Sequence, residues 1–240
     1  MTLVLAHTRA MTLELLRHPA YVVPTVAFPT VFFLFFATAD DDPNLRMATF
    51  AGFAAIGVAF FQFGVGIATE RESPWERYLR TLPVSALARL GARVLSAAIF
   101  AAASAALLVV VATASTDVAL PAEHWAELAI VLVAGTAPFA LLGIALGYWA
   151  PVRAALPIAN LLYLGLSYAG GLWFSPRHLP SIVVGVSRFL PTRALADALA
   201  GPAHGGALPW RALASLAGFS LLFAVLALAG YRQDEGRRFR

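Results

Sequence analysis

The sequence predicts an all-α integral membrane protein with six transmembrane helices in a single domain. Of its 240 residues, 60% are hydrophobic and only 12% are charged, and the mean hydropathy is positive. Six apolar stretches are each long enough to cross a bilayer, which takes about 20 residues of helix. A short polar segment separates the second stretch from the third.

Residues 1–20 are expected to form an amphipathic helix at the membrane interface. They have charged and histidine side chains spread along them, unlike the apolar core of a cleavable signal peptide. Apolar residues recur at helical spacing and would form one stripe. The stripe consists of Leu3, Ala6, Ala10, Leu13 and Leu16. A disordered tail is the alternative.

Residues 21–240 are expected to form the six-span domain. The spans have soft ends, because hydropathy fixes a helix centre better than its boundary. They run approximately over residues 21–39, 47–69, 94–115, 128–150, 154–174 and 212–231.

The polar segment 70–85 predicts a short surface helix. Ser73 can cap its N-terminus, Pro74 suits the first helical position, and Glu76 completes a capping box. Pro83 ends the helix. Apolar side chains recur at Trp75, Tyr78, Leu79 and Leu82, so the charged side with Arg77 and Arg80 is left free.

Arginine placement predicts that both termini are cytoplasmic. With six spans, twelve arginines fall on the side of the termini and five on the other, and short cytoplasmic loops are enriched in positive charge. The twelve are Arg9, Arg17, Arg71, Arg77, Arg80, Arg89, Arg93, Arg153, Arg232, Arg237, Arg238 and Arg240. The polar helix 70–85 is therefore expected inside the cell.

Missing residue types exclude several functions. The chain has no lysine, which rules out a P-loop of the form G-x-x-x-x-G-K-[ST] and lysine-based covalent catalysis. It has no cysteine, which rules out disulfides and thiolate metal sites. The arginines flank spans instead of clustering on one soluble face, so nucleic acid is not an expected partner.

The predicted spans contain no ionisable side chain, which disfavours an ion-coupled transporter. The few polar groups at depth, together with neighbouring aromatic rings, suit a path for a bulky amphipathic substrate. The candidate path residues are Phe60, Gln62, Phe63, Asn160, Tyr163 and Ser167. The alternative is that the polar groups only join helices inside the bilayer.

The segment 175–209 predicts two short helices, over residues 180–190 and 192–200, bounded by prolines and by the Gly201-Pro202 pair. Helices of this length do not cross a bilayer and suit a re-entrant element at the outer mouth. Candidate outer-gate residues are Phe189, Arg193 and Asp197. An ordinary extracellular loop with surface helices is the alternative.

Two stretches resemble the membrane subunit of type-two ATP-binding-cassette (ABC-2 type) exporters. Glu70-Arg71-Glu72, then Trp75-Glu76-Arg77-Tyr78-Leu79 and Leu82-Pro83-Val84-Ser85, is similar to the coupling-helix signature of that family. Gly170-Gly171-Leu172-Trp173-Phe174 with Pro176, Leu179-Pro180, Leu190-Pro191 and Asp197 resembles its segment after the fifth span. The resemblance covers nearly the whole chain. Ser73-Pro74-Trp75 departs from the small residues common at that turn.

The resemblance implies a bacterial inner-membrane permease, not an enzyme, which exports a hydrophobic or amphipathic drug, antibiotic or lipid. It implies two separate ATPase subunits that hold ATP and Mg²⁺, a second copy of the permease or a related one, and surrounding lipid. This chain would then hold no cofactor and no metal. The implied ATPase-coupling residues are Glu70, Arg71, Glu72, Trp75, Glu76, Arg77 and Arg80.

Four other readings remain open at this stage. The main one is an ATP-independent secondary transporter or channel, and within the family a polysaccharide or lipid-linked glycan exporter is the alternative. A purely structural membrane subunit is a third. An intramembrane protease is disfavoured, because no span holds a histidine that could activate Ser167.

Overall fold

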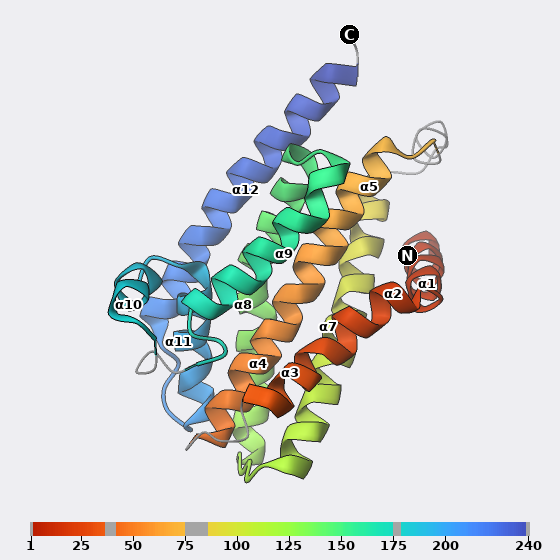
Figure 1. Ribbon diagram of the computed structural model, residues 1–240. Helices are drawn as coiled ribbons and strands as arrows, with labels where there is room; N and C mark the ends of the chain where they lie inside the picture. The colour runs from red at the N-terminus through yellow and green to blue at the C-terminus, as the bar shows by residue number, and fades with distance from the viewer. Residues whose placement is uncertain (1, 37–41, 75–85, 175–178, 239–240) are drawn as a thin grey trace.

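The computed structural model describes residues 2–36, 42–74, 86–174 and 179–238, and the secondary structure in these ranges is helical throughout (Figure 1). The chain begins with α1 (Thr2–Leu16). A continuous helix follows, formed by α2 (Pro19–Val22), the π-helix η1 (Val23–Ala27) and α3 (Phe28–Phe36). Pro24 and Pro29 each remove a backbone donor from this helix, which accounts for its departure from regular α-helix.

A single central helix of 30 residues runs from Pro43 to Glu72. It consists of α4 (Pro43–Val58), the π-helix η2 (Ala59–Val65) and α5 (Gly66–Glu72). Its N-terminus is well defined, because the Asp42 carboxylate accepts the backbone N–H of Leu45 at 3.1 Å. Of its most apolar stretch, 78% is buried inside the protein.

The remaining helices pack against this central helix or against its neighbours. They are α7 (Ala86–Ser115), α8 (Ala122–Trp149), α9 (Val152–Ala169), α10 (Ser181–Ser187), α11 (Pro191–Ala203) and α12 (Trp210–Arg238). The C-terminal end of α12, the end of α5 and the turn from α8 to α9 lie at one end of the molecule, which we call the inner end (Figure 1). The start of α4 and the connection from α7 to α8 lie at the opposite, outer end.

Four of the predicted spans are confirmed as helices long and apolar enough to cross a membrane: Pro43–Glu72, Arg89–Ser115, Ala122–Trp149 and Trp210–Glu235. The first predicted span coincides with the shorter apolar helix Val23–Phe36, and the fifth with the 18-residue α9. That these two cross the membrane stays a prediction.

The helices extend beyond the predicted spans, so they contain ionisable residues although no predicted span does. The span centres are uncharged, but the helix ends contain ionisable residues that the structure buries. Arg46 is 6% exposed and Arg93 is 9% exposed. Hydropathy placed both outside the spans because it assigns a charge to water, whereas here each guanidinium has a polar partner inside the protein.

The predicted N-terminal helix is confirmed as α1, and its apolar stripe is left uncovered by the rest of the protein. Leu3, Leu13 and Leu16 of this stripe are 47%, 41% and 52% exposed. The opposite side meets α7, where the hydroxyl groups of Thr8 and Thr12 donate to the Ala92 carbonyl at 3.5 Å and to Ser96 Oγ at 3.2 Å. An uncovered stripe fits a helix whose apolar face lies in lipid, so the interfacial position stays the expectation.

The two predicted helices between the fifth and sixth spans are also confirmed, as α10 and α11. The predicted end of the second was three residues early, because α11 continues through Pro202 to Ala203. It ends in a Schellman motif: Gly205 has φ +67°, and the N–H of Gly206 donates to the carbonyl of Gly201 at 2.9 Å. Leu195 and Leu199 of α11 are fully buried.

Close contact between α8 and the central helix depends on two glycines. A Cβ added at Gly143 would lie 2.7 Å from the Ala59 carbonyl oxygen, and one at Gly147 would lie 2.7 Å from the Cβ of Ile67. Small residues four apart let two helix backbones approach in a membrane. This pair therefore fixes α8 against η2 and α5.

Candidate functional site

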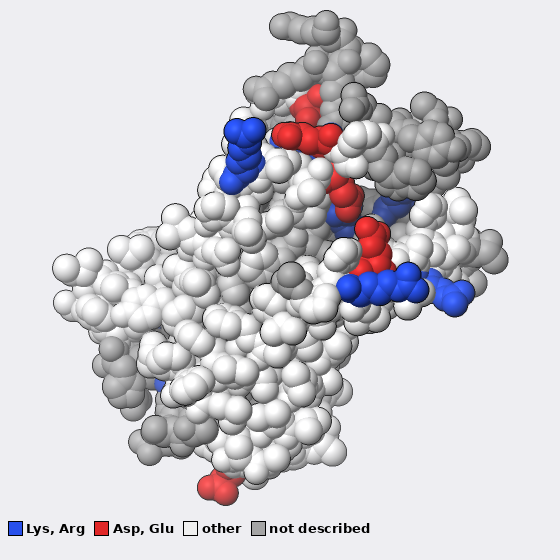
Figure 2. Space-filling model, turned by 45° about the vertical axis from the view of Figure 1, so that its right-hand side comes forward, with Lys and Arg blue, Asp and Glu red and all other residues white. Residues whose placement is uncertain are grey.

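Charged side chains gather at the inner end on one face of the protein. Figure 2 shows acidic and basic side chains gathered toward the end where α5 and α12 terminate, while the lower part of the same face is mostly uncharged. Three of the seven predicted ATPase-coupling residues, Glu70, Arg71 and Glu72, lie in the last turn of α5 at this end. Trp75, Glu76, Arg77 and Arg80 lie outside the described residues, so their roles stay predictions.

Arg71 makes contacts within the chain at this end. Its Nη1 donates to the Tyr148 carbonyl at 2.7 Å and to the Asp234 carboxylate at 3.1 Å, and its Nη2 donates to the Ala150 carbonyl at 3.1 Å. The two carbonyls belong to the end of α8, where a cation is favoured because last-turn carbonyls lack helical donors. Arg71 thus joins α5, α8 and α12.

Glu70 and Glu72, the other described coupling candidates, differ in environment. The Glu70 carboxylate accepts a hydrogen bond from Nη2 of Arg93 on α7. Glu72 is exposed. Ser73, directly after α5, has φ −68° and ψ 135°, the extended conformation that an N-cap residue adopts. Of the three charged residues that open the segment, Glu72 is the most exposed, although the Glu70 side chain is itself 46% exposed.

Gln62 lies in the π-helix η2 and faces α7. Its Nε2 donates to Ser96 Oγ at 3.1 Å, and its Oε1 is buried without a hydrogen-bond partner among the described residues. Ser96 also accepts the Thr12 hydroxyl of α1. A short polar chain therefore connects the interface helix to the middle of the central helix.

Tyr163 and, near it on α9, Ser167 lie at an aromatic cluster, whereas Phe60 and Phe63 of η2 are buried in the hydrophobic core. The Tyr163 ring stacks on Phe53 with centroids 4.4 Å apart, and Trp173 meets Phe53 edge-on at 5.4 Å. Tyr163 is 2% exposed, and Ser167 is fully buried. Within one copy these side chains are packed against neighbours and do not line an open channel.

Asn160 is the path candidate nearest the surface. It is half-buried on α9, next to Leu161, which is 73% exposed. A Cβ added at Gly165, one turn further along, would meet no heavy atom within 4 Å. The structure thus separates the path candidates that carry a polar group into two groups: Gln62 faces α7, and Asn160, Tyr163 and Ser167 lie on α9.

The predicted outer-gate residues lie on α11 and just before it. Arg193 and Asp197 form an ion pair one turn apart, with Nε to Oδ1 at 2.8 Å. The Phe189 ring is 79% exposed. Thr192 binds α11 to the preceding span, because its hydroxyl donates to the Leu166 carbonyl at 2.6 Å.

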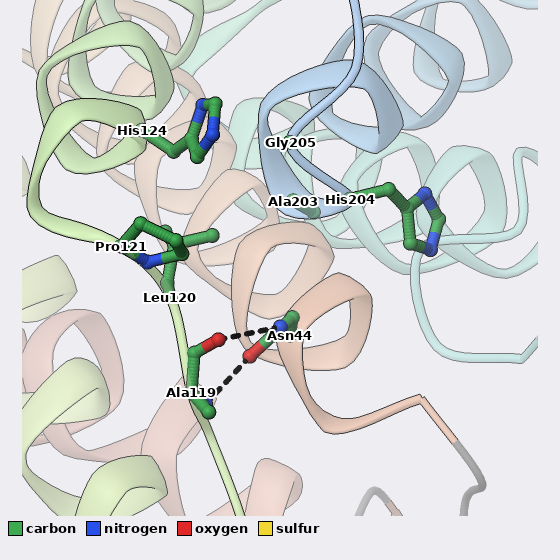
Figure 3. A pocket seen from close by; sticks show the side chains of 8 residues that line it. All are labelled: Asn44, Ala119, Leu120, Pro121, His124, Ala203, His204 and Gly205. Atoms are coloured by element: carbon green, nitrogen blue, oxygen red, sulfur yellow. Dashed lines mark hydrogen bonds between the residues drawn. The ribbon is translucent and has the colours of Figure 1, made fainter.

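A pocket of about 450 Å³ opens at the outer end, lined by Asn44, Ala119, Leu120, Pro121, His124, Ala203, His204 and Gly205. Figure 3 shows the Asn44 amide bound at both ends to the backbone of Ala119. His204 pairs with the Asp42 carboxylate at 2.6 Å and turns away from His124. The two imidazoles do not converge, and no metal-binding group is found among the described residues.

Sequence reasoning missed Arg93, Asp234 and the glycine pair on α8. The pair could have been found as a G-x-x-x-G spacing inside an apolar stretch. Arg93 directly precedes the predicted third span and was counted only as a charge that sets orientation. Asp234 gave no signal, because its partner Arg71 is far away in the sequence.

Comparison with known proteins gives two findings. The family model described as ABC-2 type transporter matches residues 2–202. A protein of Bacillus subtilis (strain 168), named "Putative transport permease YvfS", is 23% identical to this chain over 230 residues. That alignment covers 92% of this chain and 94% of the Bacillus protein.

Proposed function

Because the chain belongs to the ABC-2 type transporter family, we propose that it is the membrane subunit of an exporter driven by ATP. Permeases of this family work with an ATP-binding-cassette ATPase. Two ATPase subunits would hold ATP and Mg²⁺ beneath two permease copies. The substrate would be a hydrophobic or amphipathic compound such as a drug, an antibiotic or a lipid.

The central helix is the observation that carries this proposal. It is one helix of 30 residues, it is the most deeply buried of the four long helices, and its last turn, Glu70 to Glu72, is the start of the polar segment. A movement imposed on this last turn would therefore reach the core through one continuous helix. Moving a two-state path almost completely from one form to the other takes about 5.5 kcal/mol of differential binding, and a stiff, buried connection suits that demand.

The exposed side of α9 supports a path between two permease copies. Asn160 lies on this helix and is only half-buried, and a polar side chain facing lipid is costly. The neighbouring Leu161 and Gly165 leave the surface open for a partner or a substrate. A second copy seated on this side would cover Asn160 and enclose a path with aromatic walls and few polar groups.

The test of coupling uses the permease reconstituted with its ATPase. We expect Trp75→Ala, or Glu76→Ala combined with Arg77→Ala, to separate ATP hydrolysis from transport while the permease stays folded in the membrane. Trp210→Ala is the matched control, since this tryptophan is 70% exposed at the start of α12, at the outer end. ATPase pull-down, hydrolysis and uptake into inverted vesicles are measured side by side.

Two results would contradict the proposal. Transport by the purified permease without any ATPase would identify a secondary transporter or channel. Unchanged transport in the Trp75→Ala variant, with normal ATPase binding, would remove the assigned role of the polar segment. Screening hydrophobic drugs and lipids for stimulation of hydrolysis in nanodiscs would identify the substrate class.

The position of the path is tested by cross-linking. The chain has no cysteine, so one cysteine in place of Leu161 reports without background. We expect a bifunctional thiol reagent to join two copies through position 161, and not through a cysteine in place of Leu221, which is 72% exposed on α12. Equal cross-linking at both positions would argue against the α9 side.

A further inference from the structure

The π-helix η2 leaves one backbone carbonyl in need of a donor. The N–H of Gly66 donates to the carbonyls of Phe61 and Phe63. It does not donate to the Gln62 carbonyl, which would be its acceptor in a regular α-helix. An unsatisfied carbonyl in a membrane interior is costly. The Gln62 carbonyl therefore requires a donor from elsewhere in the protein.

Arg93 of α7 supplies this donor. Its Nη1 donates to the Gln62 carbonyl at 3.1 Å, and its Nη2 donates to the Glu70 carboxylate. The Arg93 side chain is 11% exposed, so its charge depends on these partners. One guanidinium thus spans the π-helix and the last turns of α5.

Gly66 provides the space for this contact. A Cβ added at Gly66 would lie 3.1 Å from Nη1 of Arg93, which is closer than ordinary van der Waals contact. The guanidinium would have to move by a few tenths of an ångström. Since Gly66 lies between the two groups that Arg93 joins, its missing side chain is part of the arrangement.

The first π-helix, η1, shows by contrast why Arg93 matters. There Pro29 cannot donate to the Thr25 carbonyl, and the fully buried Ser104 of α7 donates to that carbonyl instead, at 3.1 Å. Proline makes the irregular geometry of η1 permanent. The segment 59–65 has no proline, so these residues can also form a regular α-helix. Their π-helical form therefore depends on contacts with other helices.

We propose that Arg93 is a positioning residue that keeps η2 in its π form and so sets the rotation of α5 up to its end at Glu72. Without Arg93, η2 can return to α-helix. Conversion of the π-helix to α-helix removes its one-residue insertion, which rotates the following helix by about 100° and shifts it along its axis by about 1.5 Å. The meaning of this for coupling rests on the proposed function, but the rotation itself can be measured in the permease alone.

The experiment uses spin labels and double electron–electron resonance on the permease in nanodiscs without ATPase. Labels are attached to cysteines in place of Thr69 on α5 and Ala229 on α12, both exposed. A rotation of about 100° moves a side-chain tip 5–6 Å from the helix axis by about 8 Å. A second pair, in place of Val110 and Leu221, is 64% and 72% exposed on α7 and α12 and reports on the rest of the fold.

We expect Arg93→Gln to shift the distance between the labels at 69 and 229 by up to about 8 Å, or to add a second population of that distance shifted by this amount. The distance between the labels at 110 and 221 should stay unchanged. Arg93→Lys should give a smaller change than Arg93→Gln, because lysine keeps a charged donor. Its ammonium group cannot donate to the Gln62 carbonyl and the Glu70 carboxylate together as the planar guanidinium does. Gly66→Ala should shift the distance in the same direction. Gly218→Ala on α12, where a Cβ meets nothing within 4 Å, is its control.

An unchanged 69–229 distribution in Arg93→Gln overturns the inference. If Arg93→Gln also alters the 110–221 distance, the variant has lost its fold, and Gly66→Ala then decides: a shift supports the inference and no shift overturns it. Failure of the proposed function would appear separately, as transport without an ATPase. With the ATPase present, we expect Arg93→Gln to bind it normally and to lower transport per ATP hydrolysed.

Discussion

Replacing Arg71 tests whether this residue stabilises the permease itself. Arg71→Ala would remove three hydrogen bonds, to the Tyr148 and Ala150 carbonyls and to the Asp234 carboxylate. Arg71 and Asp234 side chains are 13% and 14% exposed, so water replaces these bonds only in part. Breaking one partner of a buried ion pair typically costs about 3–5 kcal/mol, and we take about 3 kcal/mol for this partly buried one.

The measurement is thermal unfolding of the detergent-solubilised permease, followed by loss of the monodisperse peak in size-exclusion chromatography. For a chain of this size, about 3 kcal/mol corresponds to a decrease in Tm of roughly 6–12 °C. Arg153→Ala, at an exposed arginine of α9, is the control and should change Tm by less than about 2 °C. Asp234→Asn combined with Arg71→Ala should cost less than the sum of the two single changes, because they share one interaction.

One result would refute this reasoning. If Arg71→Ala leaves Tm unchanged and instead weakens ATPase binding, then Arg71 serves the partner and the contacts to α8 and α12 are incidental. Arg71→Lys refines the test. A lysine can pair with Asp234 or with the α8 carbonyls but not with all of them, so an intermediate Tm is expected.

Two further changes test the packing of single elements. Gly147→Ala should destabilise the permease by about 1–3 kcal/mol, the usual cost of overpacking, because the new Cβ would lie 2.7 Å from the Cβ of Ile67. The control Gly165→Ala, whose Cβ meets nothing within 4 Å, should leave Tm unchanged or raise it. Equal effects of the two substitutions would argue against close packing of α8. Thr192→Val should lower stability by about 1 kcal/mol, since it loses the 2.6 Å hydrogen bond to the Leu166 carbonyl; an unchanged Tm would mean that this bond contributes nothing.

Local chemistry made several elements predictable from the sequence. Pro191 marks the start of α11, directly before the start predicted at residue 192. The central helix begins at Pro43 with Asp42 as its cap, four residues before the predicted second span, so this local signal was missed. These signals act within a few residues, so they survive whatever surrounds them. The end of α11 was predicted less well, because Pro202 fits inside its last turn and the Gly205 turn ends it three residues later.

The candidate site could be predicted only in part. The polar segment stands out because it interrupts the apolar pattern, and Glu70 and Arg71 were recognised as its start. Their partners, Arg93 and Asp234, are 23 and 163 residues away in the chain. Sequence spacing contains no information about such contacts, since they form only when separate helices pack together.

By itself the sequence determined that long apolar helices form, approximately where they lie, and that a polar segment follows the second one. The tertiary structure alone decided which helix is central. Of the four long helices, Pro43–Glu72 is the least apolar and yet the most buried, with 78% of its apolar stretch inside, against 28% for Arg89–Ser115, the most apolar. The physical reason is that lipid is as apolar as a protein core. Hydropathy therefore separates helix from water but not the inside of this protein from its lipid-facing side.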